Sequence, residues 1–475
     1  MEWVMLLRHK LGVLSPLDVG AAIAAIGSIV GAAATGQWYI VVAVGAAGIT
    51  LRLLIRYQRL HWVVFFGIMP WYFHQVEEGI SVFDIVMAAY LASLLLGWFV
   101  WVLAVRREEL MWNRSDAILW LGLIGSLFSA ISAVSRGISF LDWAREWAML
   151  ATVGYYFVLR SLFSTEDGFE FYVRLLVLMT VSLVVIGVLN FREQILQALY
   201  AYQIRGTRGV NAVYLIGFFL SVSLFLFARR LGYRLLWLVV AGLIVGGIIA
   251  TYTRTVWVGT AVGILVMLVL LPSRQRWRLV VALAGGIVII YGIARVVLGP
   301  AYPTVSRLIT YRFLTLRTAT KQASIIERRD ETRQVLHLLS RPDVAVAGIG
   351  AGNRYVYYDS YLGKPVLTHF THNGMLGLLL KFGIPVGLTV YLFHLVMVAK
   401  SFVSYFRSRH TRWEPYVLPF TLTLFATTII DWTTNAFLMR SGAMFLGMLY
   451  AGIAIADRLI AREISRSYGN DLTAP

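Results

Sequence analysis

The sequence predicts an all-α fold, a polytopic bundle of transmembrane helices with one large polar loop outside the membrane that contains short helices. Three observations support this prediction. The chain is 59% hydrophobic with only 14% charged residues, its mean hydropathy is +0.74, and it contains repeated apolar runs of about 17 to 25 residues, each long enough to cross a bilayer as a helix. A β-barrel would instead show segments of about ten residues that alternate between apolar and polar, and the sequence lacks this pattern.

The apolar runs predict fourteen spans. Twelve is an alternative, because the third run is short and the sixth is interrupted by tyrosines. In chain order the spans are expected at about 17–34, 38–55, 61–74, 80–105, 116–135, 146–162, 169–190, 210–228, 234–251, 256–271, 277–298, 374–399, 415–431 and 441–459. This pattern predicts eleven spans within 1–298, a large loop at 299–371, and three spans with a C-terminal tail within 372–475.

Basic residues predict the orientation of these spans, because Lys and Arg are enriched in the cytoplasmic loops of membrane proteins. If the N-terminus is inside, the inner connections hold most of the basic residues and the short outer connections hold few. The inner set is Arg52, Arg56, Arg59, Arg106, Arg107, Arg114, Arg229, Arg230, Arg234, Arg274, Arg276, Arg278, Lys400, Arg407, Arg409 and Arg412. We therefore expect both termini to be cytoplasmic and the loop at 299–371 to be extracytoplasmic.

Several classes of chemistry are disfavoured. The net charge of +18 is explained by basic helix ends that meet anionic lipid, so no nucleic acid partner is expected. The chain has no cysteine, which excludes disulfides, thiolate metal sites and a cysteine nucleophile. Neither a Walker A motif nor an Asp-x-Asp motif on a cytoplasmic loop occurs, so no nucleotide and no cofactor is expected.

Three arginines are expected on the outer face, although basic residues are usually enriched on the cytoplasmic side. Arg254 lies in a short break between two apolar runs, and Arg205 and Arg208 precede another run. A guanidinium group binds phosphate oxygens as a bidentate fork and stays charged at any working pH. These residues are candidates to bind a pyrophosphate; alternatively, each could extend towards the interface or pair with a carboxylate such as Asp431.

The large loop carries further candidates. A helix is expected from about 323 to 340, ending before Pro342, and Arg329 and Arg333 would share one face of it. The glycines at 348–353 are expected to form turns. The tyrosines that follow could stack on sugar rings or lie in the aromatic belt of the membrane interface, and we favour the belt.

His372 stands where the polar loop ends and an apolar helix begins. Imidazole is the side chain best able to take a proton near neutral pH, so His372 is a candidate general base. Asn373 could orient a substrate or cap the helix. His369 is three residues away, but no carboxylate joins the two histidines at ligand spacing, so no metal site is expected.

Taken together, these motifs resemble the O-antigen ligase and polymerase family of membrane glycosyltransferases. The resemblance covers about residues 200–400 and rests on the order of several motifs. The matching positions are Arg205 or Arg208, Thr253-Arg254, Arg328 or Arg329, Pro342, the turn from Gly348 to Gly352, His372-Asn373 and Gly383. The chain departs from the family at Asn211-Ala212, where Asn-Pro-Asn is common, and at Thr255, where glycine is usual.

The resemblance implies a GT-C-like bundle in a bacterial inner membrane, with its active site facing the periplasm. It implies transfer of a glycan from an undecaprenyl-pyrophosphate carrier to an acceptor hydroxyl, with inversion and without metal. The implied catalytic residues are His372, Arg254 and Arg208, and the implied substrate-binding residues are Arg205, Arg328, Arg329, Arg333 and Asn373.

A ligase would use a lipid A core sugar as the acceptor, and three alternatives to it stay open. We favour the ligase slightly over a polymerase that uses a lipid-linked repeat as the acceptor. Relatives of this type also glycosylate proteins. A transporter of a small anion is the alternative from another class, with the arginines lining a path; the absence of an internal repeat and the clustering of polar residues at one face disfavour it.

Overall fold

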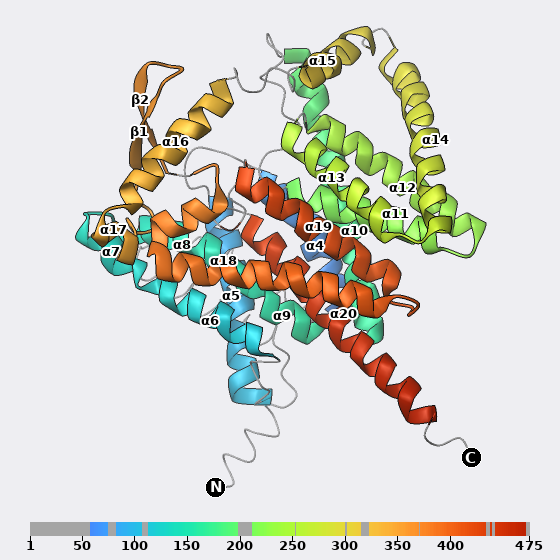
Figure 1. The fold of residues 1–475 in the computed structure, drawn as a ribbon, viewed down its shortest axis with the longest axis horizontal. Helices are drawn as coiled ribbons and strands as arrows, with labels where there is room; N and C mark the ends of the chain where they lie inside the picture. The colour runs from blue at the N-terminus through green and yellow to red at the C-terminus, as the bar shows by residue number, and fades with distance from the viewer. Residues whose placement is uncertain are drawn as a thin grey trace.

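The computed structural model describes residues 58–74, 82–106, 113–197, 211–251, 253–299, 302–314, 323–369, 371–433, 438 and 442–471. These residues are mostly helical (Figure 1). Before the large loop they form α4 (Gln58–His74), α5 (Val82–Val100) with a π-helical turn (Trp101–Arg106), α6 (Arg114–Leu127), α7 (Ser129–Ser135), α8 (Phe140–Ala151), a 3₁₀ turn (Thr152–Gly154), α9 (Tyr155–Leu162), α10 (Glu166–Gln197), α11 (Asn211–Phe227), α12 (Leu231–Ala250), α13 (Arg254–Leu270) and α14 (Ser273–Leu298).

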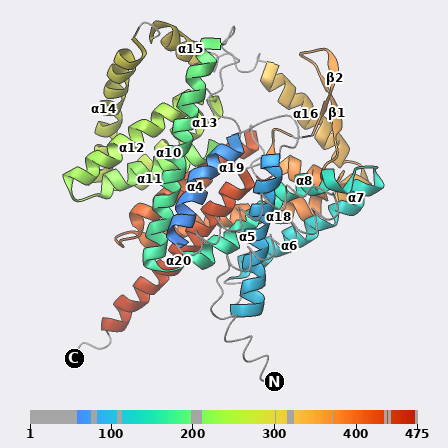
Figure 2. The ribbon, with the colours of Figure 1, turned by 180° about the vertical axis from the view of Figure 1, so that it is seen from behind.

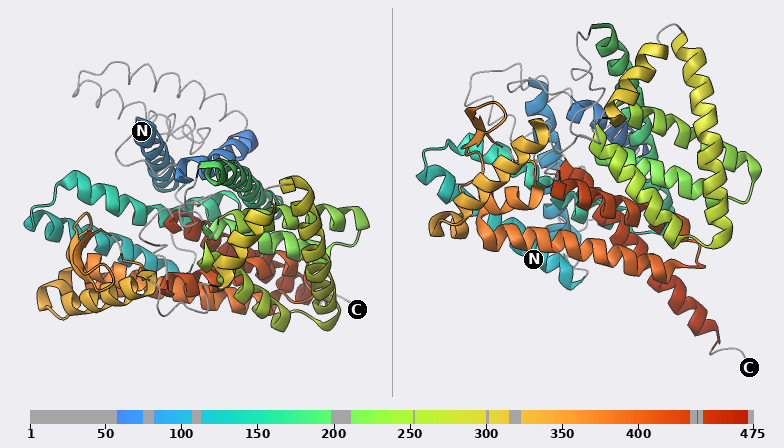
Figure 3. Two further views of the ribbon diagram at one scale, coloured as in Figure 1. Left: turned by 90° about the horizontal axis from the view of Figure 1, so that it is seen from above. Right: turned by 45° about the horizontal axis from the view of Figure 1, so that its top comes forward.

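The large loop and the C-terminal part follow. The loop contains α15 (Tyr302–Leu314), α16 (Ala323–Leu339), α17 (Pro342–Ala347), β1 (Tyr355–Asp359) and β2 (Lys364–Thr368), and the last helices are α18 (Gly374–Ser408), α19 (Glu414–Thr433) and α20 (Gly442–Asp471). In Figure 1, α18 and α19 lie in front of α4, α5 and α10, which come forward in the reverse view of Figure 2. Seen from above, α16 and the hairpin lie on the α18 side of the molecule (Figure 3).

The chain is a multi-pass membrane protein. Five of the described helical segments are long and apolar enough to cross a bilayer: Arg114–Ser135, Glu166–Leu189, Leu231–Ala250, Gly374–Ser408 and Gly442–Arg466. Three shorter apolar helices are Tyr90–Leu103, Val213–Phe227 and Arg254–Leu270. The count of fourteen or twelve spans stays a prediction, and the spans expected at 17–34 and 38–55 lie outside the described residues.

Glycines allow the helices of the bundle to pack closely, as is common between membrane helices. A methyl group added at Gly263 of α13 would lie 2.1 Å from the Phe219 ring of α11, and one at Gly259 would lie 2.5 Å from Ile430 of α19. The start of α13 therefore lies against the end of α19. This contact brings Arg254 to the same end of the bundle as the start of α18.

The helix α18 is bent near its beginning. Gly383 has φ 80° and ψ 162° inside the helix, and Pro385 follows two residues later. Proline has no N–H, so the carbonyl of Lys381 loses its usual helical donor. The backbone N–H groups of Gly350 and Ile349 donate instead to the carbonyls of Lys381 and Leu380, at 3.1 and 2.7 Å. The large loop thus supplies hydrogen bonds that the bent helix cannot make for itself.

The large loop has a small hydrophobic core of its own that joins it to α18. Its buried members are Val335, Val344, Ile349, Tyr355, Tyr357, Leu376 and Leu380. They come from α16, α17, the following turn, β1 and the first turns of α18. The loop is therefore seated on the segment of α18 that directly follows His372.

The two-stranded antiparallel sheet in this loop differs from the sequence analysis, which expected only short helices. Residues Tyr355 to Asp359 alternate between buried and exposed, the pattern of a strand with one covered face. Tyr355 and Tyr357 face inward and are nearly fully buried, whereas Tyr358 is exposed. The belt and the sugar-stacking interpretations therefore do not describe Tyr355 and Tyr357, because their rings pack against α16 and their hydroxyl groups bond to its carboxylates.

Candidate functional site

Asn373 occupies the N-cap position of α18. Its Oδ1 accepts the backbone N–H of Leu376 at 3.0 Å, and its Nδ2 donates to the carbonyl of Trp432 at 2.8 Å. The first bond satisfies one of the free amides at a helix start. The second ties this start to the end of α19. The structure thus gives Asn373 the capping role, one of the two roles considered for it.

His372, the residue before this cap, is held by a carboxylate from the large loop. Its backbone N–H and its Nδ1 both lie within hydrogen-bond distance of Oε2 of Glu331, at 2.9 and 3.0 Å. The Tyr355 hydroxyl donates to the other oxygen, Oε1, at 2.9 Å. Glu331 is 3% exposed, whereas the His372 side chain is 34% exposed. The described residues make no hydrogen bond to Nε2 of His372, which leaves that nitrogen available to a substrate.

Arg328 lies one turn before Glu331 on the same face of α16. Its side chain is partly covered, and its Nε is buried without a hydrogen-bond partner among the described residues. Burial lowers the pKa of the Arg328 guanidinium, while the nearby charges of Glu327 and Glu331 oppose this shift. A guanidinium stays charged despite such a shift, so Arg328 brings a positive charge to the site.

Arg254 is the first residue of α13 and lies close enough to Arg328 for the two positive charges to act on each other. The repulsion between two guanidinium groups would be offset by an anion bound between them. The start of α13 favours an anion as well, because the free amides and the dipole at a helix N-terminus carry partial positive charge. The arrangement is suited to phosphate oxygens.

The ends of three helices meet around this site. A methyl group added at Gly374 of α18 would lie 2.1 Å from Oδ1 of Asp431 in α19. The start of α13 packs against the same end of α19, as described above. Residues distant in sequence therefore come together: Arg254 from α13, Arg328 and Glu331 from the loop, and His372 before α18.

The structure separates the other arginines of α16 from this group. Arg329 and Arg333 lie 3.7 and 4.0 Å from Oδ1 of Asp330, with side chains 57% and 70% exposed. Asp330 in turn accepts the backbone N–H of Ser360 in the hairpin turn at 3.0 Å. These exposed arginines therefore form ion pairs within α16, with the same carboxylate that bonds to the hairpin turn. Arg205 and Arg208 lie outside the described residues.

The glycine turn after α17 connects the loop to the bundle. Gly348, Gly350 and Gly352 all have positive φ, at 71°, 88° and 80°, a conformation that glycine adopts without strain. A methyl group added at Gly350 would lie 2.6 Å from the backbone nitrogen of Ala133, and one at Gly352 would lie 2.8 Å from the backbone of Asp142. The turn thus packs directly against the backbone of α7 and α8.

A buried ion pair lies behind this turn. Lys381 of α18 and Glu146 of α8 are 3.0 Å apart, with side chains 2% and 7% exposed. Lys381 Nζ also donates to the carbonyl of Asn353 at 2.5 Å, and the Gly352 N–H donates to Glu146. The contacts of this ion pair connect the glycine turn, α8 and α18. We therefore assign it the role of holding the loop against the bundle.

Sequence reasoning missed Glu331, Tyr355, Lys381 and Glu146. Glu331 could have been noticed because it lies three residues after Arg328 and so shares its face of the helix. Lys381 is a single charge inside an apolar helix, which itself indicates a buried partner. His369 lies near the charges of Arg354, Lys381 and Arg145, and burial together with these cations lowers its pKa. In the described part of the chain, no three His, Asp or Glu side chains gather as a metal site would require.

A comparison with known families supports the family resemblance. Residues 239–392 match the family model described as O-antigen ligase. The matched region includes Arg254, α16, the glycine turn, His372 and the bend of α18. A search of curated proteins returns no match to the chain.

Proposed function

We propose that this chain, which belongs to the O-antigen ligase and polymerase family, transfers a glycan from an undecaprenyl-pyrophosphate carrier to an acceptor hydroxyl. The reaction takes place at the periplasmic face of a bacterial inner membrane, inverts the anomeric carbon, and needs neither metal nor nucleotide. One observation carries the proposal: a single face of α16 brings Arg328 to Arg254 and Glu331 to His372. This face places positive charge and a candidate base side by side.

The positive charges stabilise the diphosphate, which is the leaving group. A glycan attached to a diphosphate is already activated, so the protein has to orient the substrates and stabilise the negative charge that develops on the diphosphate. Arg254 and Arg328 bind the diphosphate oxygens in our proposal, helped by the start of α13 and by Arg205 or Arg208. Because the carrier is a lipid, a site at the ends of membrane helices lets the diphosphate enter while its chain stays in the bilayer.

His372 acts as the general base on the acceptor hydroxyl. The acceptor oxygen attacks the anomeric carbon and forms the new glycosidic bond, while the bond from that carbon to the diphosphate oxygen breaks and its electrons leave with the diphosphate. Nε2 of His372 takes the proton of the acceptor hydroxyl. Attack on the face opposite the diphosphate inverts the anomeric carbon.

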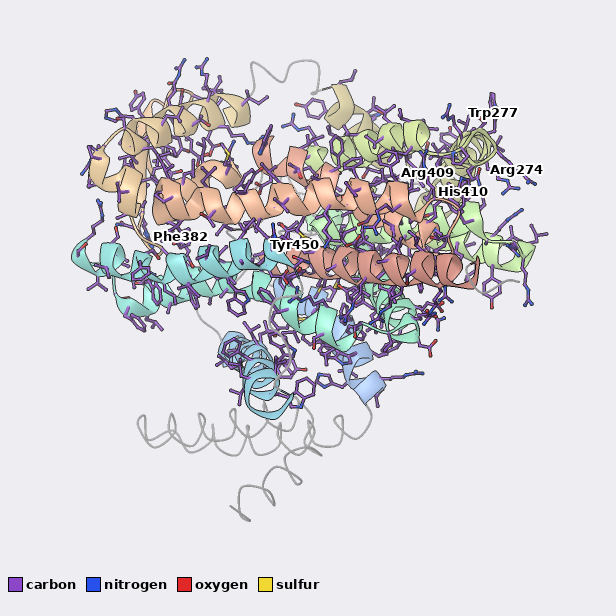
Figure 4. All side chains as sticks on the ribbon, turned by 60° about the horizontal axis from the view of Figure 1, so that its bottom comes forward. Arg274, Trp277, Phe382, Arg409, His410 and Tyr450 are labelled. Carbon is purple, nitrogen blue, oxygen red and sulfur yellow. The ribbon has the colours of Figure 1, made fainter. Side chains whose placement is uncertain are left out.

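The orientation in the membrane follows from the basic end of the molecule. Figure 4 places Arg274, Trp277, Arg409 and His410 together at one end, with Phe382 of α18 towards the other. Arg276 and Arg409 donate to the carbonyls of Leu271 and Leu270 at the end of α13, where a cation is favoured by the helix dipole. We assign this end to the cytoplasm by the positive-inside trend, which puts the start of α18 and the site on the periplasmic side.

The deciding experiment incubates the purified protein, in lipid nanodiscs, with a radiolabelled lipid-linked oligosaccharide and a lipid A core acceptor. A labelled glycolipid product supports the ligase that we favour, whereas a longer lipid-linked chain without acceptor use would identify a polymerase. No transfer with either acceptor, together with anion uptake into proteoliposomes, would replace the proposal by a transporter.

The same assay tests His372. A general base contributes about 10²- to 10⁴-fold to the rate, so His372→Ala should lose most turnover while it still binds the lipid-linked donor. Binding is measured by retention of the labelled donor on the nanodiscs. If His372→Ala kept full turnover, the base would have to be another group.

A further inference from the structure

We infer that Glu331 is a positioning residue that keeps the proton of His372 on Nδ1, and that Tyr355 holds Glu331 in place for this task. The inference rests on the proposed function, in which Nε2 of His372 accepts the proton. Neutral imidazole can carry its proton on either nitrogen, and only the form with Nδ1–H has a basic Nε2. A transferase of this kind needs that form.

The hydrogen bonds around Glu331 select the form. An ionised carboxylate only accepts hydrogen bonds. Oε2 of Glu331 lies 3.0 Å from Nδ1 of His372 and 2.9 Å from the backbone nitrogen of the same residue. Nδ1 must therefore donate to form this bond, and the second contact limits movement of the backbone that carries the ring.

The other carboxylate oxygen is held as firmly. The hydroxyl of Tyr355 donates to Oε1 at 2.9 Å, and Tyr355 is itself 5% exposed in the small core of the loop. Its partner across the sheet is Thr368, so the register of the hairpin sets where this hydroxyl lies. Both carboxylate oxygens of Glu331 are thus hydrogen-bonded. The orientation of the imidazole therefore depends on how α16 packs against the hairpin.

The same loop offers a matched control. Glu327 lies one turn before Glu331, and it accepts the hydroxyl of Tyr357 at 3.0 Å as Glu331 accepts that of Tyr355. The structure gives no hydrogen bond between Glu327 and His372. The pairs Glu331 with Tyr355 and Glu327 with Tyr357 thus share residue types, helix and strand, and differ in the contact with His372.

The first test needs no substrate. Protein labelled with ¹⁵N in its histidine rings is studied by NMR in nanodiscs, and the signals of His372 are identified by their loss in His372→Gln. We expect neutral His372 to carry its proton on Nδ1 in the unmodified protein. In Glu331→Gln the amide offers both a donor and an acceptor to Nδ1, so the other form should appear, whereas Glu327→Gln should leave the signals unchanged.

The second test is kinetic. Glu331→Gln should lower kcat by roughly 10- to 1000-fold, within the range that a correctly oriented base contributes, with little change in KM for the lipid-linked donor. Tyr355→Phe should show a smaller loss of kcat, and Tyr357→Phe and Glu327→Gln should retain most of the activity. If Glu331→Gln does not fold, the inference is tested by the proton position in the spectrum of the unmodified protein and by the loss of kcat in Tyr355→Phe.

The two tests separate this inference from the proposed function. A proton on Nε2 in the unmodified protein, or an unchanged spectrum and rate in Glu331→Gln, would overturn the positioning role even if glycan transfer is observed. A proton on Nδ1 in a protein without transferase activity would leave the role of Glu331 standing and refute the proposed reaction.

Discussion

At the scale of single residues, neighbours of the same type have different tasks in this protein. Arg328 is partly buried beside Arg254, whereas Arg329 is largely exposed and pairs with Asp330. A helix turns by about 100° from one residue to the next, so consecutive arginines point to different sides. The environment therefore assigns the phosphate-binding role to Arg328 in our proposal.

The first prediction compares these arginines. Loss of a charge-assisted contact with the diphosphate should cost on the order of 2–4 kcal/mol, which is roughly 30- to 1000-fold in rate. We expect this loss of kcat/KM in Arg254→Ala and Arg328→Ala, measured by glycan transfer. Arg333→Ala is the control on the exposed face and should retain most of the activity. An active Arg328→Ala with a normal fold would remove Arg328 from the site.

The second prediction concerns the buried ion pair of Lys381 and Glu146. Removing one partner leaves the other as an uncompensated buried charge, which typically costs about 3–5 kcal/mol. We expect Lys381→Met to lower the thermal unfolding temperature clearly in nanodiscs. The double variant Lys381→Met with Glu146→Gln should recover a large part of the loss, because no isolated charge remains. A single variant as stable as the unmodified protein would contradict this account.

At the scale of elements, the loop and the bent helix complete each other. The bend of α18 leaves the carbonyls of Leu380 and Lys381 without their usual donors, and the N–H groups of Ile349 and Gly350 satisfy them. The glycines have no side chain, so this backbone can approach α7, α8 and α18 closely, and glycine also adopts the positive φ of the turn without strain. The position of α16, and with it that of Glu331 and Arg328, depends on this contact.

The third prediction tests the contact with two glycines that both have positive φ. Gly350→Ala places a methyl group 2.6 Å from the backbone of Ala133, whereas a methyl group at Gly363 in the hairpin turn meets nothing within 4 Å. Gly363→Ala should cost only the conformational penalty, on the order of 1–2 kcal/mol. Gly350→Ala should in addition loosen the loop, seen as faster hydrogen exchange of α16 and loss of transfer activity. Equal exchange in the two variants would show that the close packing is unimportant.

At the scale of the whole molecule, the candidate site and the cluster of Arg274, Arg409 and His410 lie towards opposite ends of the bundle. The arginines around α14 and the end of α18 lie at one end, and the start of α18 with the loop lies towards the other (Figure 4). This separation gives the bundle a direction in the membrane. It also places the candidate site on one side only, which the proposed reaction requires.

The fourth prediction concerns this direction. The chain has no cysteine, so single cysteines can be labelled without background. Ser340→Cys at the end of α16 should react with a membrane-impermeant maleimide from the periplasmic side of intact cells. Ser465→Cys near the end of α20 should react only after the membrane is opened. Labelling of both positions from the same side would refute the orientation.

The sequence by itself determined that the chain is a helical membrane protein and which family it resembles. Apolar runs longer than a bilayer is thick permit few other folds, because every backbone polar group in lipid has to be satisfied within a helix. His372, Arg254 and Asn373 could be singled out as well. Each stands at the boundary between an apolar run and a polar segment, and such a boundary is visible in the chain itself.

Only the tertiary structure decided how these boundaries meet. The contact of α13 with α19 joins residues more than a hundred positions apart. The hairpin and the start of α18 join Glu331 to Tyr355 and His372, which lie 24 and 41 positions away, and no local pattern encodes such contacts. Glu331 and Tyr355 illustrate the reason. In the sequence one is an ordinary charge on a polar helix and the other an ordinary tyrosine, and they acquire a role because packing excludes water from them and places both beside His372.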